Sequence, residues 1–178
     1  MAWYTLFVMT GYEHAVASTI SRSWRIDGLR PFVPMFDARF RKAGKVLSEK
    51  RRLIPGYIFI ESELSGLDFY LQVKPHIVRT EKALKLLSYG DGHADSSFEM
   101  LEAEHSFLNE FLNNEQCVEM SHGYMKGTSV VVTDGPMVGH EGLIKKVNRH
   151  KMEATIEMFL LGSVREVTVG LEVVSKLA

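Results

Sequence analysis

Cysteine is almost absent from this chain of 178 residues, which contains only Cys117. A single cysteine excludes an intrachain disulfide and any zinc site built from several cysteines. No apolar run approaches the roughly 18 residues that a membrane-spanning helix needs. The apolar start of the chain lacks the basic lead-in and the cleavage-like small residues of a signal peptide. We therefore expect a cytoplasmic protein with no membrane partner.

Motifs for catalysis and for cofactor binding are also missing. The sequence contains no Walker loop and no Gly-x-Gly-x-x-Gly. Its seven histidines include no pair at the four-residue spacing of a helical zinc site, and Cys117 has no sequence-defined base. We expect a protein that is not an enzyme, with no catalytic residues, no metal and no cofactor.

Excess charge of one sign is absent overall, but the charges are unevenly distributed. The formal net charge is −1, and the apolar and charged fractions of 46% and 24% are typical of a globular protein. Residues 1–60 carry ten Lys and Arg against four Asp and Glu, whereas residues 61–120 carry four against twelve. This separation predicts strong local fields that the net charge conceals.

The stretch Leu53–Ile60, LIPGYIFI, is the most distinctive in the chain. Pro55 fixes φ and Gly56 permits positive φ, so the chain can change direction within two residues. The four apolar residues that follow are good strand formers, and an unbroken apolar run is typical of a strand covered on both faces. An ordinary core strand explains this pattern as well as a binding surface does.

The first half of the chain otherwise reads as an α/β domain. Thr10 and Glu13 have the spacing of a capping box, which predicts a helix that continues to about Trp24. The other expected elements are a strand over Trp3–Met9, an irregular edge strand over Leu29–Phe36, a short helix over Gly66–Val73 that Pro75 stops, and a strand at Ile77–Val78.

A cluster of basic residues precedes the LIPGYIFI stretch. Asp37–Arg52 contains seven cations and two acids around an Ala43-Gly44 turn, which predicts an extended basic hairpin. The cations are Arg39, Arg41, Lys42, Lys45, Lys50, Arg51 and Arg52. They could contact nucleic acid, or they could form a solvated edge that resists aggregation.

The second half predicts a helix, a linker and a small β domain. Ser96 and Glu99 form a second capping box, which predicts a helix to about Asn113, and the polar segment Asn114–Lys126 reads as a linker. Short Val-rich strands with frequent Gly turns then predict a small antiparallel barrel. The expected organisation is residues 1–95, a connecting segment 96–126, and a barrel over 127–178.

Two separated stretches resemble the NusG family of transcription elongation factors. The first comprises Trp3-Tyr4, Thr10–Glu13 and the IPGYIFI strand; the second, GTSVVVTDGPMVGHEGLIKKV, resembles a KOW motif with Gly127, Gly135, Pro136 and Gly142 at its turns. The resemblance covers essentially the whole chain. It implies an α+β protein with an N-terminal NGN-type α/β sandwich and a C-terminal KOW β-barrel.

The resemblance implies that the first domain docks on the clamp helices of the RNA polymerase β′ subunit. Matched by position, the docking pocket would contain Phe7, Ile54 and Phe59. Asp68, Phe69 and Tyr70 fall near the region that reaches the opposite side of the polymerase cleft. Bridging the cleft would disfavour the paused state by differential binding, without chemistry.

Asn148–Lys151 and Val169–Val174 resemble LoaP, a specialised branch of the family associated with processive antitermination. This resemblance implies recognition of a hairpin in nascent leader RNA but does not assign the residues. On charge alone, the candidates are the seven cations of Asp37–Arg52 with Arg22 and Arg25 as neighbours. Upstream DNA is an alternative ligand, and we expect a monomer.

A late barrel loop departs from the family pattern. Leu160–Ser163 stands where general NusG proteins have Ile-Phe-Gly-Arg, so the inherited contacts with Rho and with a ribosomal protein are in doubt. The barrel contains a smaller basic cluster, for which a solvated face is a slightly better interpretation than RNA binding. Its residues are Lys145, Lys146, Arg149 and Lys151. Two alternative functions remain: a general polymerase adaptor without specific RNA recognition, and a generic KOW RNA-binding module.

Some specialised members of the family refold the barrel into a helical hairpin. The last 50 or so residues alternate like strands and are rich in Val and Gly, which disfavour helix. We therefore expect a stable barrel.

Overall fold

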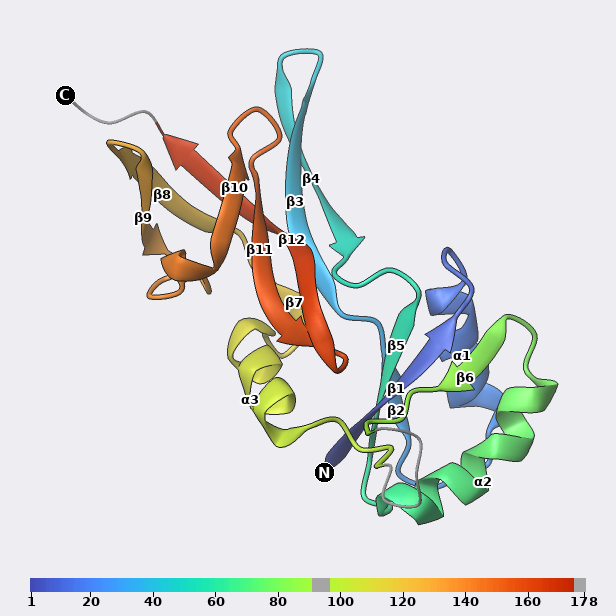
Figure 1. The fold of residues 1–178 in the computed structure, drawn as a ribbon. Coiled ribbons are helices and arrows are strands. Elements are labelled where there is room, and N and C mark those ends of the chain that lie inside the picture. The colour runs from blue at the N-terminus through green and yellow to red at the C-terminus, as the bar shows by residue number, and fades with distance from the viewer. Residues whose placement is uncertain (91–96, 175–178) are drawn as a thin grey trace. The chain divides into compact units, whose positions relative to one another are not determined.

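The computed structural model describes residues 1–90 and 97–174, which form two compact units. The first unit comprises Met1–Val33 and Ile54–Ser106, and the second comprises Pro34–Leu53 and Phe107–Ala178. The chain thus leaves the first unit to build a hairpin in the second and then returns (Figure 1). Among the described residues, no helix is long and apolar enough to cross a membrane.

The first unit is a four-stranded antiparallel sheet with helices. Its strand order is β2-β5-β1-β6, so that β5 and β1 are central. The elements are β1 (Ala2–Val8), α1 (Glu13–Ser23), β2 (Arg30–Phe32), β5 (Tyr57–Ser62), α2 (Gly66–Arg79) and β6 (Ala83–Leu86). Ile58, Phe59 and Ile60 are buried, which confirms that the apolar strand is covered on both faces. The expected edge position near Pro31 is confirmed, but the strand predicted over Leu29–Phe36 ends at Phe32. Met35 and Phe36 begin β3 (Met35–Lys42), which belongs to a different sheet.

The second unit is built from two sheets. A five-stranded sheet has the order β10-β11-β12-β8-β9, and a three-stranded sheet has the order β4-β3-β7. Its elements are β3 (Met35–Lys42), β4 (Lys45–Arg52), β7 (Cys117–Val118), β8 (Ser121–Lys126), β9 (Ser129–Asp134), η1 (Glu141–Leu143), β10 (Ile144–Asn148), β11 (Glu153–Leu160) and β12 (Ser163–Val174). Together, the two units confirm the predicted α+β fold class.

Five local predictions are wrong, three of them in the first unit. The helix α2 continues through Pro75 to Arg79, because Phe69, Val73 and Ile77 form a buried stripe that continued helix formation keeps in the core. No strand forms at Ile77–Val78, and β6 takes that place. The capping box at Thr10 is not formed, since the N-cap is Tyr12 without a side-chain hydrogen bond.

The other two differences concern the predicted connecting segment. The helix α3 (Glu102–Phe111) begins later than expected, after Ser97 and Glu99 form bridges with Tyr89 and Tyr4; Ser96 lies outside the described residues. The expected linker instead contributes β7 and β8. The strand β8 pairs in parallel with β12, so the small β domain is not purely antiparallel. Such long-range pairing overrides the polar composition that suggested a linker.

Candidate functional site

The sheet of the first unit presents aromatic residues on the face opposite Tyr4. Side chains alternate along a strand, and Tyr4 stacks on Phe69 of α2 with ring centroids 3.7 Å apart. Trp3 and Phe7 therefore point to the other face, where Phe59 and Tyr57 of β5 join them. We call this surface the aromatic face.

One half of the aromatic face is closed and the other half is open. The Phe59 ring lies 5.9 Å from Trp3 and 5.6 Å from Phe32, and it is fully buried. The His105 ring lies 4.2 Å from Trp3, and burial lowers the pKa of that imidazole. Ile54 is also buried. The Phe59 and Ile54 side chains are therefore not available to a binding partner.

The open half is formed by Phe7 and Tyr57. Their ring centroids are 5.3 Å apart, and both side chains are partly exposed. Lys85 of β6 lies directly across from Phe7 and is exposed. Of the predicted pocket residues, only Phe7 is therefore accessible, while Tyr57 and Lys85 were not predicted. The strand alternation from Phe59 could have identified Tyr57, but nothing in the sequence pairs Lys85 with Phe7.

The Pro55-Gly56 turn is fastened to the start of α1 by the buried side chain of Glu13. One carboxylate oxygen accepts the Gly56 N–H at 2.8 Å, and the other accepts the Gly11 N–H at 2.9 Å. Gly56 has φ of +87°, and a Cβ there would lie 3.2 Å from Thr10 Oγ1 and 3.5 Å from Phe7. Glu13 thus holds the turn beside Phe7 instead of capping the helix.

Replacing Glu13 by alanine is expected to lower the free energy of unfolding of the first unit by about 2 kcal/mol, since two backbone donors lose their acceptor. Glu13→Gln keeps one acceptor oxygen and should cost about half as much. Both tryptophans lie in the first unit, so denaturant unfolding followed by tryptophan fluorescence measures the effect. Equal stability of Glu13→Ala and wild type would contradict this role.

The three residues near the start of α2 that sequence matching grouped together differ in their exposure to solvent. Phe69 is fully buried against Tyr4, so its ring is a core contact and cannot form part of an exposed surface. Tyr70 is partly exposed and stacks on Phe98 at 4.2 Å. The Asp68 carboxylate accepts the Ser65 hydroxyl at 2.8 Å. Only Asp68 and Tyr70 remain available to a partner.

The base of the basic hairpin is anchored within the second unit. β3 pairs in parallel with β7 through Met35–Cys117 and Phe36–Val118. A Cβ added at Gly170 of β12 would lie 2.2 Å from the carbonyl oxygen of Asp37, so the two backbones are in direct contact there. Only glycine allows this approach, and it fixes β3 to β12.

Cys117 is part of this anchor, and its thiol donates to the Asp37 carboxylate at 3.5 Å. Burial, together with the nearby Asp37 carboxylate, raises the pKa of the thiol to about 12. We expect iodoacetamide to label the native protein at pH 8 at least about a thousandfold more slowly than the denatured protein, as measured by mass spectrometry. Labelling at the denatured rate would contradict the buried position.

The same shift predicts how pH affects stability. The unfolded thiol loses its proton near pH 9, while the folded thiol keeps it to about pH 12. The unfolded state therefore binds fewer protons in this window, and the contribution of Cys117 to stability falls as pH rises from 9 to 12. Cys117→Ala should lack this component of the alkaline destabilisation.

Three of the seven hairpin cations already have acidic partners inside the second unit. Arg39 donates to Glu172 at 2.8 Å. Lys50 lies 2.6 Å from Glu115, which raises the pKa of the amine and lowers that of the carboxyl. Arg51 contacts Glu153 at 2.8 Å and Glu49 at 2.5 Å. Arg52 is partly exposed near the base.

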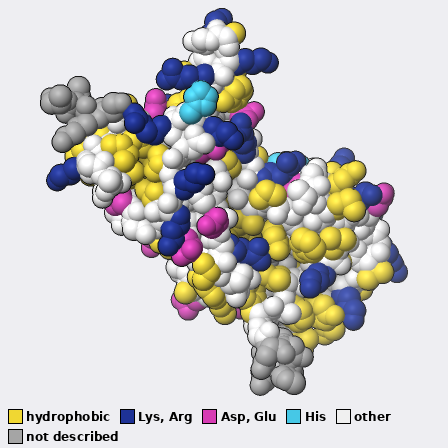
Figure 2. All heavy atoms as spheres, turned by 45° about the horizontal axis from the view of Figure 1, so that its top comes forward, with side chains coloured by type: hydrophobic (Ala, Val, Ile, Leu, Met, Phe, Trp, Pro, Cys, Tyr) yellow, Lys and Arg dark blue, Asp and Glu magenta, His cyan; other side chains and the backbone are white. Residues whose placement is uncertain are grey.

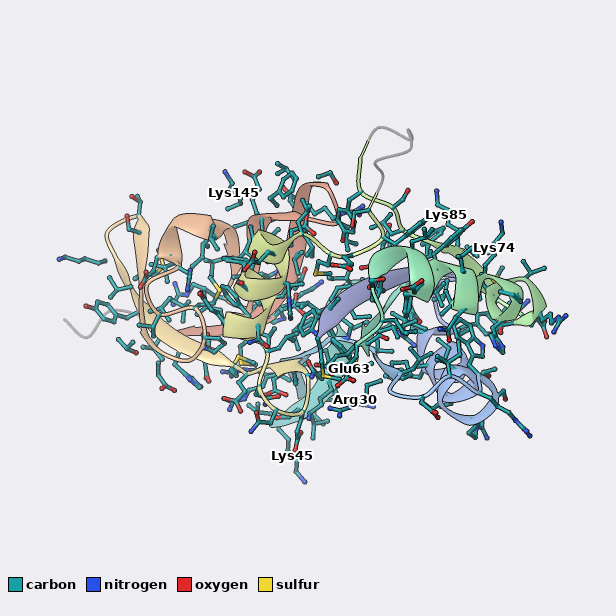
Figure 3. The ribbon with its side chains drawn as sticks, turned by 90° about the horizontal axis from the view of Figure 1, so that it is seen from below. Arg30, Lys45, Glu63, Lys74, Lys85 and Lys145 are labelled. Atoms are coloured by element: carbon teal, nitrogen blue, oxygen red, sulfur yellow. The ribbon has the colours of Figure 1, made fainter. Side chains whose placement is uncertain are left out.

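The remaining cations, Arg41, Lys42 and Lys45, surround the Ala43-Gly44 turn at the end of the hairpin. All three are exposed, and none has an acidic partner within residues 1–90 and 97–174. Figure 2 shows Lys and Arg side chains around the projecting end of the hairpin, and Figure 3 shows Lys45 pointing away from the ribbon. We call these three residues the tip cluster.

The other basic candidates are distributed elsewhere. Arg22 and Arg25 are exposed at the end of α1 and belong to the first unit, whereas the tip cluster belongs to the second. On the barrel, Lys145 pairs with Glu157 at 3.2 Å. Lys146 and Lys151 are exposed.

The KOW-like stretch has the backbone geometry that its glycines predict. Gly127 and Gly135 have φ of +65° and +94°, and a Cβ at Gly135 would lie 2.6 Å from the Ser121 Cα. Pro136 follows Gly135 between β9 and η1. Gly142 lies in η1, where an added Cβ would have no atom within 4 Å. Leu160 and Leu161 are buried at the β11–β12 turn, which leaves Gly162 and Ser163 exposed. No aromatic side chain projects from these four positions.

Comparison with known proteins places these features in one family. The family described as "Transcription termination factor nusG" matches residues 1–106, and the KOW motif matches residues 126–159. The chain belongs to the NusG family. The matched segments include the aromatic face, the hairpin and the glycine turns of the second unit.

Curated relatives agree with this assignment at low identity. The "Transcription termination/antitermination protein NusG" of Pasteurella multocida is 22% identical over 98% of this chain and 94% of its own length. The Haemophilus influenzae protein of that name is 24% identical over 88% and 85%, and the Halalkalibacterium halodurans protein is 22% identical over 96% and 94%. NusG-family proteins are transcription factors without enzymatic activity, as predicted for this chain.

Proposed function

We propose that this NusG-family protein is a processive antitermination factor of the LoaP type, which docks on the β′ clamp helices of RNA polymerase and is recruited by a hairpin in leader RNA. The tip cluster is the observation that carries the RNA-binding part. Three exposed cations lie within five residues on a hairpin anchored at its base, and none of them has an acidic partner among the residues that the structure describes. Proteins recognise duplex RNA largely through its phosphates and its shape. A cluster of exposed cations can contact those phosphates.

Polymerase docking is assigned to the open half of the aromatic face. A pocket for the tip of a helix needs large apolar groups with little conformational freedom. Phe7 and Tyr57 provide them, with ring centroids 5.3 Å apart, whereas Ile54 and Phe59 are buried and contribute to the core. Asp68 and Tyr70 would contact the opposite side of the polymerase cleft. A cytoplasmic location accords with this function and stays a prediction.

A polymerase adaptor without specific RNA recognition is the alternative, and one observation favours it. Arg39, Lys50 and Arg51 bind acids of their own unit, which reduces the charge that the hairpin can offer to RNA. The family match over residues 1–106 speaks against a generic KOW module without a polymerase role. Contacts with upstream DNA, Rho or a ribosomal protein have no comparable support.

Reconstituted transcription tests the proposal. Core polymerase transcribes a template with a candidate leader hairpin upstream of a terminator, and a second template lacks the hairpin. Readthrough that rises only on the first template supports an RNA-recruited antiterminator. Equal readthrough on both supports the adaptor, and no effect together with no co-elution with polymerase overturns both. Tyr57→Ala, which leaves the tip cluster intact, should abolish the effect on either template.

A further inference from the structure

The distal part of the basic hairpin is open on both of its faces. Every residue from Arg41 to Leu47 is exposed, whereas Arg39, closer to the base, is held by Glu172. Side chains alternate between the two faces of a strand, and residues directly opposite each other in an antiparallel pair share a face. Beyond the anchored base, a ligand can therefore reach the hairpin from either side.

The strand register divides the tip cluster between these two faces. Lys42 lies opposite Lys45 on one face, and Arg41 lies opposite Val46 on the other. A flat ligand surface can contact only one face of a two-stranded ribbon at a time. A groove can contact both faces, because its two walls lie on opposite sides of a ribbon that enters it. The division of the cations therefore favours a groove in an anionic ligand.

The pair of Lys42 and Lys45 is a second observation that points to an anion. Like charges directly opposite each other destabilise an antiparallel pair, and these two lysines face each other beside the turn. Neither amine has an acidic partner within the described part of the chain. A phosphate group that contacts both amines would remove their repulsion and form charge-assisted hydrogen bonds with them. The hairpin thus has an unfavourable contact that nucleic-acid phosphates would relieve.

The shape of RNA limits which groove the hairpin can enter. The major groove of uninterrupted A-form RNA is too deep and narrow for protein side chains to read. The two strands of a ribbon lie about 4.8 Å apart, and side chains add to this width. A bulge or an internal loop interrupts the stack of base pairs and opens the groove beside it, and proteins that select particular RNA sequences target such places. An interrupted stem is therefore the RNA that fits this hairpin.

We propose that the distal hairpin enters the major groove of an RNA stem beside a bulge or an internal loop. Lys42 and Lys45 would contact phosphates of one wall of the groove, and Arg41 would contact those of the other. Val46 and Leu47 are 53% and 40% exposed and would lie against unstacked bases. The inference rests on the proposed function, because it specifies the class of RNA that recruits the protein.

The experiment measures binding of the full-length protein to three labelled nucleic acids by fluorescence anisotropy at low salt. Two are RNA hairpins with the same stem and loop, one of which carries a bulge of three uridines in the stem. The third is a DNA duplex with the stem sequence, since the major groove of B-form DNA admits a two-stranded ribbon without a bulge. We expect the bulged RNA to bind at least about tenfold more tightly than either of the others.

Two single variants test the two faces of the hairpin separately. Lys45→Gln removes a cation from one face, and Arg41→Gln removes the cation from the other. Each should weaken binding to the bulged RNA by at least about threefold, because each face contacts its own wall of the groove. Lys85→Gln removes an exposed cation of the first unit and is the matched control, which should bind as wild type does.

Lys45→Glu separates RNA binding from the stability of the hairpin. It places opposite charges across the pair with Lys42, so the hairpin amides should exchange with solvent no faster than in wild type, as measured by NMR. The same variant should bind the bulged RNA more weakly than Lys45→Gln does, because glutamate repels phosphate. Faster amide exchange with unchanged RNA binding would show that the lysine pair has a structural role, which would overturn the inference.

Failure of the inference and failure of the proposed function give different results. Tight RNA binding without a preference for the bulge, equal binding of the DNA duplex, or a loss of affinity in only one of the two face variants would overturn the inference alone. Absence of binding to both RNA hairpins would overturn the RNA-recruited function and the inference with it.

Discussion

Replacing Arg41, Lys42 and Lys45 together by glutamine is expected to weaken binding to a hairpin-containing leader RNA at least about tenfold at low salt. The three cations of the tip cluster are exposed and without acidic partners in the described part of the chain, so their charge is available to phosphates. Each lost phosphate contact should also reduce the slope of log K against log salt by about one unit. Fluorescence anisotropy with labelled RNA at two salt concentrations measures both effects.

The matched control removes three exposed cations from another part of the molecule. Lys74→Gln/Arg79→Gln/Lys85→Gln produces the same change in net charge but leaves the hairpin unchanged. We expect it to bind RNA within about twofold of wild type, because the three tip cations remain in place to contact the phosphates. Similar losses in both triple variants would show that the tip cluster is not the RNA-binding site.

Arg39→Gln is expected to act differently from the changes in the tip cluster. Arg39 holds Glu172 of β12, so its loss removes an internal ion pair of the second unit and leaves the tip cations in place. It should alter RNA affinity less than any single change in the tip cluster. The Arg39 side chain is about one-third exposed. Solvent therefore screens its ion pair with Glu172, and the pair contributes little to the free energy of unfolding.

Phe69→Ala is expected to destabilise the first unit by about 3–5 kcal/mol, the usual cost of removing a buried phenylalanine ring. The ring is fully buried and stacks on Tyr4, whose hydroxyl donates to the Leu64 carbonyl at 2.7 Å. Burial and the nearby Glu99 raise the pKa of this phenol well above its ordinary range. Denaturant unfolding followed by tryptophan fluorescence reports on this unit.

Tyr70→Ala is the control for Phe69→Ala, because the two residues are adjacent in sequence but differ in burial. The Tyr70 ring is partly exposed and stacks on Phe98, so its removal should cost no more than about 1.5 kcal/mol. If Tyr70 contacts polymerase, this variant should remain folded and lose activity in the readthrough assay. If Phe69→Ala were stable but did not bind polymerase, this result would show that Phe69 belongs to the docking surface and not to the core.

Local sequence patterns were sufficient wherever the decisive interactions are short-range. The Ala43-Gly44 turn, the antiparallel pairing of the basic hairpin and the covered strand at Ile58–Ile60 all follow from turn residues and strand propensity. The glycines at 127 and 135 likewise lie at turns, as their motif predicts, and both have positive φ. Each feature depends on neighbours only a few residues away.

Prediction failed where long-range contacts outweighed local preference. Pro75 is a helix breaker by its own chemistry, yet α2 continues past it because Val73 and Ile77 are buried on one side. Asn114–Lys126 has the composition of a linker, yet β7 pairs with β3 and β8 pairs with β12. Glu13 fits a capping box, yet it bonds to Gly56, which is 43 residues away.

The sequence by itself therefore determined the family, the α+β class, the position of the hairpin and the residue types that the candidate surfaces use. Only the tertiary structure decided which of these residues are available. It buries Phe59 and Phe69 and leaves Phe7 and Tyr57 accessible. It also pairs Arg39 and Arg51 with acids more than 100 residues away. Among the described residues, the three cations of the tip cluster have no acidic partner. Availability depends on burial and on partners distant in sequence, and neither property is encoded in local residue patterns.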